Sequence, residues 1–249
     1  VFVMLILLSL ALSWSAISAG RRRRTAATPA LAYGTLVIAL LAGFFIISQT
    51  NIRPVQADMI YKRARPYDDQ ATRSSQADTA TRRELWDTAI AIYTTAISRL
   101  PSEDFYYLFL GRGYLERAAI TEDRTEQSDL LSAAESLLLQ AQNLNPFNTD
   151  HTANLARLNT RWYAAVDDEA EKAERLDLAE RYYQEALVLS PQNSVIRNEL
   201  ARLILEVRGD CDRALALYDE SAEIDPYYAQ THLARADAVG PHADGVVEA

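Results

Sequence analysis

The 249-residue sequence is poor in the residues that covalent cross-links and metal sites need. It contains one cysteine, Cys211, so no disulfide can form within the chain. Its histidines, His151, His232 and His242, are far apart, and none has a second histidine or a cysteine one helical turn away. We therefore expect no metal site, and we interpret Cys211 as a half-exposed residue in a turn.

Catalytic motifs are absent as well. The sequence has no glycine-rich nucleotide loop, no H-E-x-x-H zinc motif and no G-x-S-x-G nucleophile motif. Acidic pairs such as Asp68–Asp69 and Asp167–Asp168 would need burial to become acid–base groups, and their polar surroundings predict solvated loop ends. We expect no catalytic residue and no cofactor.

Acidic residues are missing from the first 50 positions. That segment holds four of the 25 basic residues and none of the 34 acidic ones, which leaves 21 basic against 34 acidic residues in the remainder. Residues 51–249 therefore have a net charge of about −13, and they lack the basic surface that phosphate binding demands. Nucleic acid is therefore excluded as a partner.

Two long uncharged runs occupy the start of the chain. Residues 1–19 and 30–48 each have about the length that a helix needs to cross a bilayer. Four arginines lie between them, and short basic loops stay cytoplasmic, so the chain after Ser48 should emerge on the extracytoplasmic side. We predict a two-helix transmembrane hairpin over residues 1–50 in a multi-pass cell-membrane protein, with the bilayer contacted through residues 1–48. A cleaved signal peptide is disfavoured because no basic residue precedes Phe2.

The remainder of the chain contains an internal repeat. Pro101, Pro146 and Pro191 are 45 residues apart, and Pro226 follows after 35. The same three kinds of residue recur at fixed offsets before each proline. The first is small, the second is larger and apolar or aromatic, and the third is small again. These residues are Ala89, Tyr93 and Ala96, then Ala134, Leu138 and Ala141, then Ala179, Tyr183 and Ala186, and finally Ala214, Tyr218 and Ser221.

A second pattern follows Pro101, at Tyr107, Leu110, Gly111 and Tyr114. An aromatic residue, then Leu-Gly, then tyrosine at these spacings is the first-helix signature of tetratricopeptide (TPR) repeats, with tyrosine in place of tryptophan. The chain thus resembles a TPR protein. The resemblance implies antiparallel helix pairs stacked into an α-solenoid, with small residues where the two helices of a pair cross.

We predict an all-α fold from these patterns. Residues 51–56 should form a linker, residues 57–238 a TPR-type α-solenoid of about four helix pairs and a capping helix, and residues 239–249 a disordered tail. The first helix should cover residues 57–67, with Pro66 kinking or shortening it, and the polar run 68–83 should be a mobile loop. The usual period is about 34 residues, so the 45-residue units should have longer helices that meet at polar tips.

One set of residues predicts a binding mode. In TPR proteins the residue after the small position of the first helix faces the concave groove. Here the matching residues, which we call the arginine row, are Arg65, Arg112, Arg157 and Arg202. Guanidinium groups suit carboxylates or phosphates, so a protein or peptide partner would bind there. The alternative is that each arginine pairs with an acidic neighbour such as Glu116 or Glu206 on its own helix.

The whole chain also resembles the C-terminal part of O-antigen-ligase-like polytopic membrane proteins. The stretches QADMIYKR, EDFYYLFLGRGYLE and LNPFNTDHTANLARL carry this resemblance. In that family the transferase chemistry belongs to a membrane portion and an external loop that this chain lacks. The chain begins with valine, which favours the tail of a longer protein, although a valine-coded start would look identical. Two functions follow: a membrane-anchored, non-catalytic scaffold for protein–protein interaction, or an accessory region of a glycan-transferring enzyme.

Overall fold

The structure is a computed structural model, and it describes residues 29–73 and 78–243. Every element in these two ranges is helical. The contacts divide the chain into one unit that ends at Ile52 and a second that begins at Arg53, and we describe them separately. The first predicted membrane helix and the arginine loop lie outside the described residues.

The first unit contributes helix α2, Pro29–Ile47, and a π-helical turn, η1, Ser48–Ile52. Helix α2 covers the second predicted membrane segment, and Leu40 and Phe44 on it are exposed. Within the described residues one continuous helix, Val37–Arg73, is long and apolar enough to cross a membrane, judged by length and composition alone. Of the two membrane helices that the sequence predicts, only the second lies within the described residues, where this one candidate helix is found.

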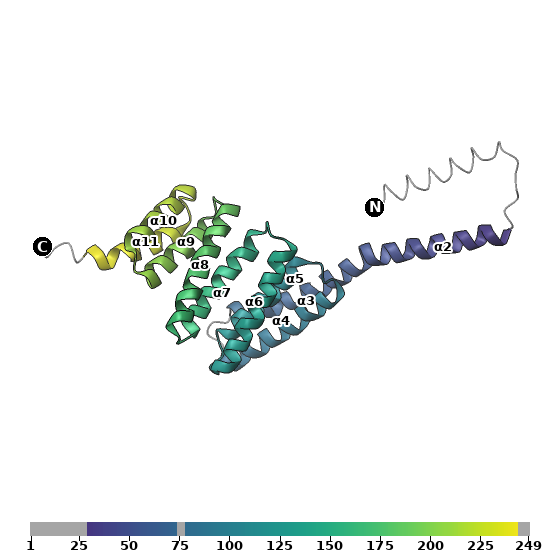
Figure 1. The fold of residues 1–249 in the computed structure, drawn as a ribbon, viewed down its shortest axis with the longest axis horizontal. Helices are drawn as coiled ribbons and strands as arrows, with labels where there is room; N and C mark the ends of the chain where they lie inside the picture. The colour runs from purple at the N-terminus through teal and green to yellow at the C-terminus, as the bar shows by residue number, and fades with distance from the viewer. Residues whose placement is uncertain (1–28, 74–77, 244–249) are drawn as a thin grey trace. The chain divides into compact units, whose positions relative to one another are not determined.

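The second unit consists of antiparallel helices stacked in chain order (Figure 1). Four pairs follow one another and a solitary helix ends the stack. The helices are α3 (Arg53–Arg73) and α4 (Thr79–Arg99), α5 (Asp104–Ala118) and α6 (Arg124–Leu144), α7 (Thr149–Ala165) and α8 (Glu169–Leu189), α9 (Ser194–Leu203, continued by the π-helical turn η2, Ile204–Arg208) and α10 (Cys211–Ile224), and α11 (Ala229–Ala243).

Short polar side chains begin these helices. Asp123 accepts hydrogen bonds from the backbone N–H groups of residues 125 and 126 at the start of α6. Asp168 and Asn193 each accept one such bond at the starts of α8 and α9. Such N-caps satisfy donors that have no partner within the helix. The second helix of each pair ends just before a proline, which cannot continue it because its ring lacks an N–H and clashes with the preceding turn.

Small residues lie where the helices of a pair meet. The sites named from the repeat pattern are buried, except Tyr107 and Tyr114, which are half-buried. Gly111 has the tightest contact: a Cβ added there would lie 2.8 Å from Leu138 Cγ and 3.3 Å from the backbone oxygen of Ala134. A longer residue at position 111 therefore cannot fit unless α5 and α6 move apart.

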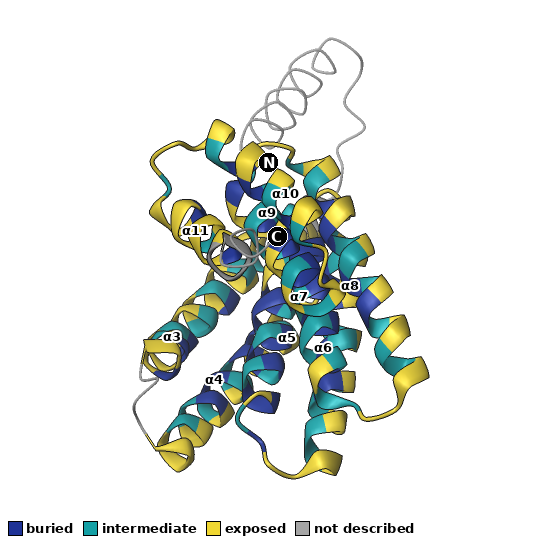
Figure 2. Ribbon diagram, turned by 90° about the vertical axis from the view of Figure 1, so that its left-hand side faces the viewer, coloured by how far each residue is buried: buried dark blue, intermediate teal, exposed yellow. Residues whose placement is uncertain are grey.

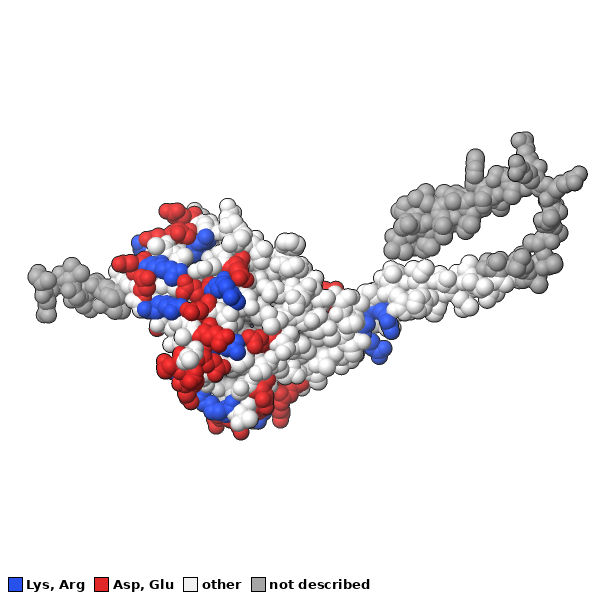
Figure 3. All heavy atoms as spheres, in the orientation of Figure 1, with Lys and Arg blue, Asp and Glu red and all other residues white. Residues whose placement is uncertain are grey.

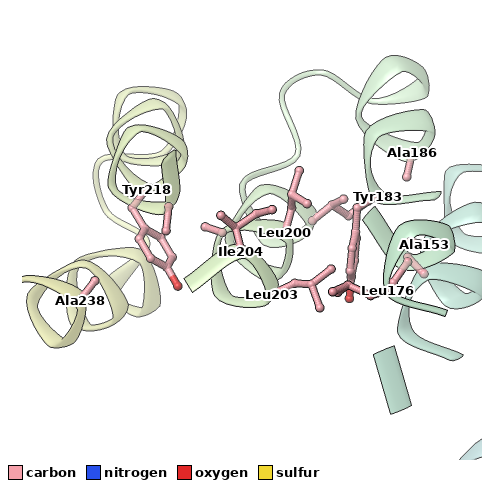
Figure 4. Packing of buried hydrophobic residues seen from close by; sticks show 14 residues of the cluster. Ala153, Leu176, Tyr183, Ala186, Leu200, Leu203, Ile204, Tyr218 and Ala238 are labelled. Atoms are coloured by element: carbon pink, nitrogen blue, oxygen red, sulfur yellow. The ribbon is translucent and has the colours of Figure 1, made fainter. Parts of the chain in front are cut away.

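Larger side chains fill the space between successive pairs. Figure 2 shows the buried residues along the sides on which neighbouring helices face one another. In the cluster of Figure 4, Leu200 and Ile204 lie between Tyr183 of α8 and Tyr218 of α10. Each repeat thus shares its core with its neighbours, as expected for a solenoid.

Four local predictions differ from the structure. Residues 51–56, the predicted linker, are helical, and α3 runs through Pro66 to Arg73. The lost hydrogen bond at Pro66 is offset because Ala64, Asp68 and Ala71, on the buried side of α3, pack in the fold. Consequently, most of the predicted loop 68–83 is helical. Residues 239–243 of the predicted tail also belong to α11, and 244–249 lie outside the described residues.

Candidate binding hollow

The repeat register brings three arginines of the row to one depression, which we call the hollow. Its volume is ≈ 620 Å³. Arg112 of α5, Arg157 of α7 and Arg202 of α9 line it, and Arg65 does not. The other residues that line the hollow are Thr72, Leu115, Glu116, Asn154, Thr160, Arg161, Tyr183, Glu199 and Glu206.

The hollow is not a uniformly cationic strip, because ion pairs between repeats neutralise part of it. Arg157 donates to both carboxylate oxygens of Glu199 in the next repeat, at 2.8 and 3.0 Å. Arg161 pairs with Glu116 of the preceding repeat at 2.7 Å. Within the row, Arg112 and Arg157 thus pair with carboxylates of neighbouring repeats, whereas Arg65 pairs with Asp69 on its own helix at 3.9 Å.

Arg202 differs from its two equivalents in the hollow. Its side chain is exposed, and no carboxylate within the described part of the chain, Glu206 one turn further on included, lies inside the 4.0 Å salt-bridge distance. Arg202 thus presents a cation without a carboxylate partner to the hollow. The Arg157–Glu199 ion pair lines the hollow beside it.

The first two residues of the arginine row, Arg65 and Arg112, lie over an aromatic ring. The guanidinium of Arg65 lies 4.8 Å from the centroid of the Phe109 ring, and that of Arg112 lies 5.3 Å away. Phe109 also contacts Tyr61 and Tyr93. Cation–π attraction of this kind holds planar guanidinium groups over a ring. Arg65 is thus held on the aromatic cluster, apart from the hollow.

Asp68 is the residue that sequence reasoning misplaced. It is 1% exposed, although the sequence predicted a solvated loop end. Its carboxylate accepts a hydrogen bond from the Tyr93 hydroxyl at 3.0 Å and pairs with Arg112 at 2.7 Å. Burial and the negative charge of Asp68 raise the pKa of Tyr93 far above its usual range. Only the continuation of α3 past Pro66 brings Asp68 into this contact.

His151 and Cys211 belong to no metal-binding group among the described residues. His151 is fully buried, and its Nε2 lies 2.6 Å from Oδ2 of Asp104, whose pKa is lowered by hydrogen bonds from His151 and Asn145 despite burial. Asn148 caps this helix. Cys211 is half-exposed at the start of α10. The described residues contain no group of three potential metal ligands.

Comparison with known proteins identifies the fold. No known protein family and no curated protein matches the sequence. Among solved structures, the thermophilic TPR protein TTC0263 of Thermus thermophilus is 24% identical over 75% of this chain and 97% of its own, with a TM-score of 0.53. MamA (17% identity, 78% and 87% covered, TM-score 0.49) and YrrB (18% identity, 72% and 77% covered, TM-score 0.43) are also similar.

The chain therefore has the fold of tetratricopeptide-repeat proteins, which confirms the solenoid predicted from the repeat pattern. The similarity concerns the fold alone at this level of identity. It does not bear on the resemblance to O-antigen-ligase-like membrane proteins, which stays a hypothesis.

The buried Tyr93–Asp68 contact generates a prediction about alkaline stability. Because the pKa of Tyr93 is raised in the folded state, folding favours its neutral phenol. The contribution of Tyr93 to the free energy of unfolding is therefore complete below about pH 10 and is lost as the pH rises toward the folded-state pKa. Tyr93→Phe should cost about 1–2 kcal/mol at neutral pH, because the hydroxyl bonds a carboxylate. Its stability should also fall less steeply than that of the wild type above about pH 10.

Denaturant unfolding at several pH values measures both effects. Tyr67→Phe, on the exposed side of α3, is the matched control and should follow the wild type. Identical pH profiles for the wild type and Tyr93→Phe would contradict the coupling.

Proposed function

We propose that this chain is a membrane-anchored, extracytoplasmic scaffold that is not itself catalytic and that holds an extended, carboxylate-bearing protein segment in the hollow. The observation that carries the proposal is Arg202, an exposed cation without a carboxylate partner in the described residues, placed beside the fixed Arg157–Glu199 pair. The TPR fold supports it, because solenoids of this class present extended concave surfaces for binding.

The surrounding groups suit an extended peptide. Asn154 donates its amide to a carbonyl of its own helix at 2.8 Å, which fixes its orientation in the wall. The Tyr183 hydroxyl is protonated at physiological pH, as in any tyrosine, and burial raises its pKa further. A partner carboxylate can thus bind Arg202, while fixed polar groups contact the peptide backbone.

The Arg157–Glu199 pair would be adaptable rather than inert. Side-chain exposure of 33% for Arg157 and 19% for Glu199 keeps this pair within reach of water, so a partner carboxylate can join it. The Arg112–Asp68 pair differs, because Asp68 is buried and replacing Arg112 as its partner would leave a buried carboxylate unpaired. We expect affinity to rest on Arg202 first and on the paired arginines second.

Membrane anchoring is supported by the composition of the first unit. Helix α2 has no charged residue, and four arginines precede it in the sequence. Basic residues next to an apolar span stay on the cytoplasmic side, which would leave the solenoid outside. Protein or peptide partners would accordingly be extracytoplasmic or part of a membrane complex.

The alternative function is an accessory region of an O-antigen-ligase-like enzyme, favoured by the combination of apolar N-terminal segments with a TPR solenoid. The hollow would then orient a partner near a lipid-linked substrate, and the chemistry would belong to a membrane portion. About ten further apolar spans upstream of Val1 in the reading frame would favour this function over the free-standing scaffold.

Site-specific photocrosslinking tests the hollow. A photoreactive residue at Thr160, inside the hollow, should capture a protein partner in cells, and one at the exposed Gln184 of α8 should not. Arg202→Ala should lower the yield at Thr160 roughly tenfold or more, since a charged hydrogen bond is worth about 1.5–3 kcal/mol. Arg202→Lys should restore part of it, because lysine keeps the charge without the planar fork.

Two results would contradict binding in the hollow. One is equal capture from Thr160 and Gln184. The other is a yield at Thr160 that Arg202→Ala leaves unchanged while the variant unfolds like the wild type.

Labelling with a membrane-impermeant maleimide tests the orientation. In a Cys211→Ser background, intact spheroplasts should label Glu122→Cys in the exposed turn before α6 and leave Thr25→Cys unlabelled until the membrane is opened. Labelling of Thr25→Cys alone would reverse the orientation.

A further inference from the structure

The solenoid has two edges with opposite character. Because successive helices are antiparallel, the turns that join one pair to the next lie on one edge, together with the start of α3. We call this the turn edge; it comprises the start of α3 at Arg53 and the turns 100–103, 145–148, 190–193 and 225–228. The turns within pairs form the opposite edge, the tip edge.

Large apolar side chains are exposed along the turn edge. The three most exposed are Tyr227 at 95%, Phe147 at 84% and Val188 at 80%, each in or next to a turn between pairs. Val55, in the first turn of α3, and Phe105, in the first turn of α5, continue the series. Each lies at a different repeat, so the apolar character belongs to the edge rather than to one loop.

The tip edge is charged and mostly acidic. Glu122 and Asp123 occupy the turn between α5 and α6, and Asp167 and Asp168 occupy that between α7 and α8. In Figure 3 the blue and red atoms of the solenoid gather on its left and lower part, and its upper right part is almost white. Uncharged residues, both polar and apolar, cover that part of the face seen in Figure 3, and the exposed side chains named above give the turn edge its apolar character.

The occupant of the turn edge follows from the connection of the chain. Helix α3 starts on this edge, and only the five residues of η1 separate it from the uncharged helix α2. An anchor in α2 would therefore bring this edge, and not the tip edge, next to the bilayer. The apolar series begins near that connection, since Ile52, the last residue of η1, and Val55, in the first turn of α3, are both exposed.

We propose that the turn edge lies against the headgroup layer of the bilayer in which the chain is anchored. Exposed Phe147 and Tyr227 suit this position, because aromatic side chains favour the interface between lipid tails and water. The edge carries charges of both signs, with exposed Arg53 and Arg99 beside Glu103 and Asp225, so the surface that fits is zwitterionic. This inference rests on the membrane anchor of the proposed function.

Depth-dependent quenching tests it on the full chain. Single-cysteine variants in a Cys211→Ser background are labelled with the environment-sensitive fluorophore NBD and reconstituted in phosphatidylcholine vesicles that contain doxyl-labelled lipid. Ala42→Cys reports on the anchor, Phe147→Cys and Tyr227→Cys on the turn edge, and Glu122→Cys on the tip edge. All four sites are exposed, so the labels leave the core intact.

We expect the label to be quenched strongly at position 42, clearly at 147 and 227 with blue-shifted emission, and not at 122. Quenching at position 42 without quenching at 147 and 227 would overturn this inference and leave the anchor standing. Absence of quenching at position 42 would instead refute the anchor, and the inference with it. Equal quenching at 122 and 147, or cross-links between two copies through position 147 without quenching there, would also overturn it.

Discussion

The close approach of α5 and α6 at Gly111 is the contact on which the rest of this architecture depends. The space beside the glycine is filled by Leu138 and by the backbone at Ala134, so a helix pair can form there only around a residue without a side chain. Buried alanines do the same work in the other pairs, for example Ala179 and Ala186 in α8. Because each pair closes at this short distance, successive repeats stack in a constant register.

Constant register has a chemical consequence on the concave side. Residues 45 positions apart come to equivalent places, which is why Arg112, Arg157 and Arg202 line one hollow. The ion pairs within it join neighbouring repeats, so they fix guanidinium groups that would otherwise be mobile in water. The last arginine has no such partner among the described residues. The same geometry therefore both stiffens the stack and leaves one cation for a ligand.

The stack could be predicted from the sequence because its determinants are local and periodic. Small residues at Ala89 and Ala96, a proline five residues later and the Leu-Gly step at position 110 recur at spacings that helix geometry imposes. Pairing within the hollow could not be predicted in this way. Asp68 reaches Arg112 across 44 residues, and this contact exists only because tertiary packing carries α3 through a proline.

Signals without a period were harder to interpret. Among the exposed apolar residues of the turn edge, Phe147 and Tyr227 each directly follow a proline, but Val188 lies three residues before one, so the sequence shows only part of this edge before the helices are stacked. The acidic pair at Asp68 looked like one more solvated turn because sequence shows composition and not burial. Tertiary contacts decide both cases.

The most direct test of this account is the unfolding free energy of Gly111→Leu. The helix crossing leaves no room for the added side chain, so strain should cost about 1–3 kcal/mol or more, and crosslinking at the hollow should decrease because the register of Arg112 shifts. Glu122→Leu, at an exposed site, adds a leucine side chain outside the crossing and should stay within about 0.5 kcal/mol of the wild type. Equal stabilities of the two variants would contradict the claim that close helix contact at Gly111 sets the register of the solenoid.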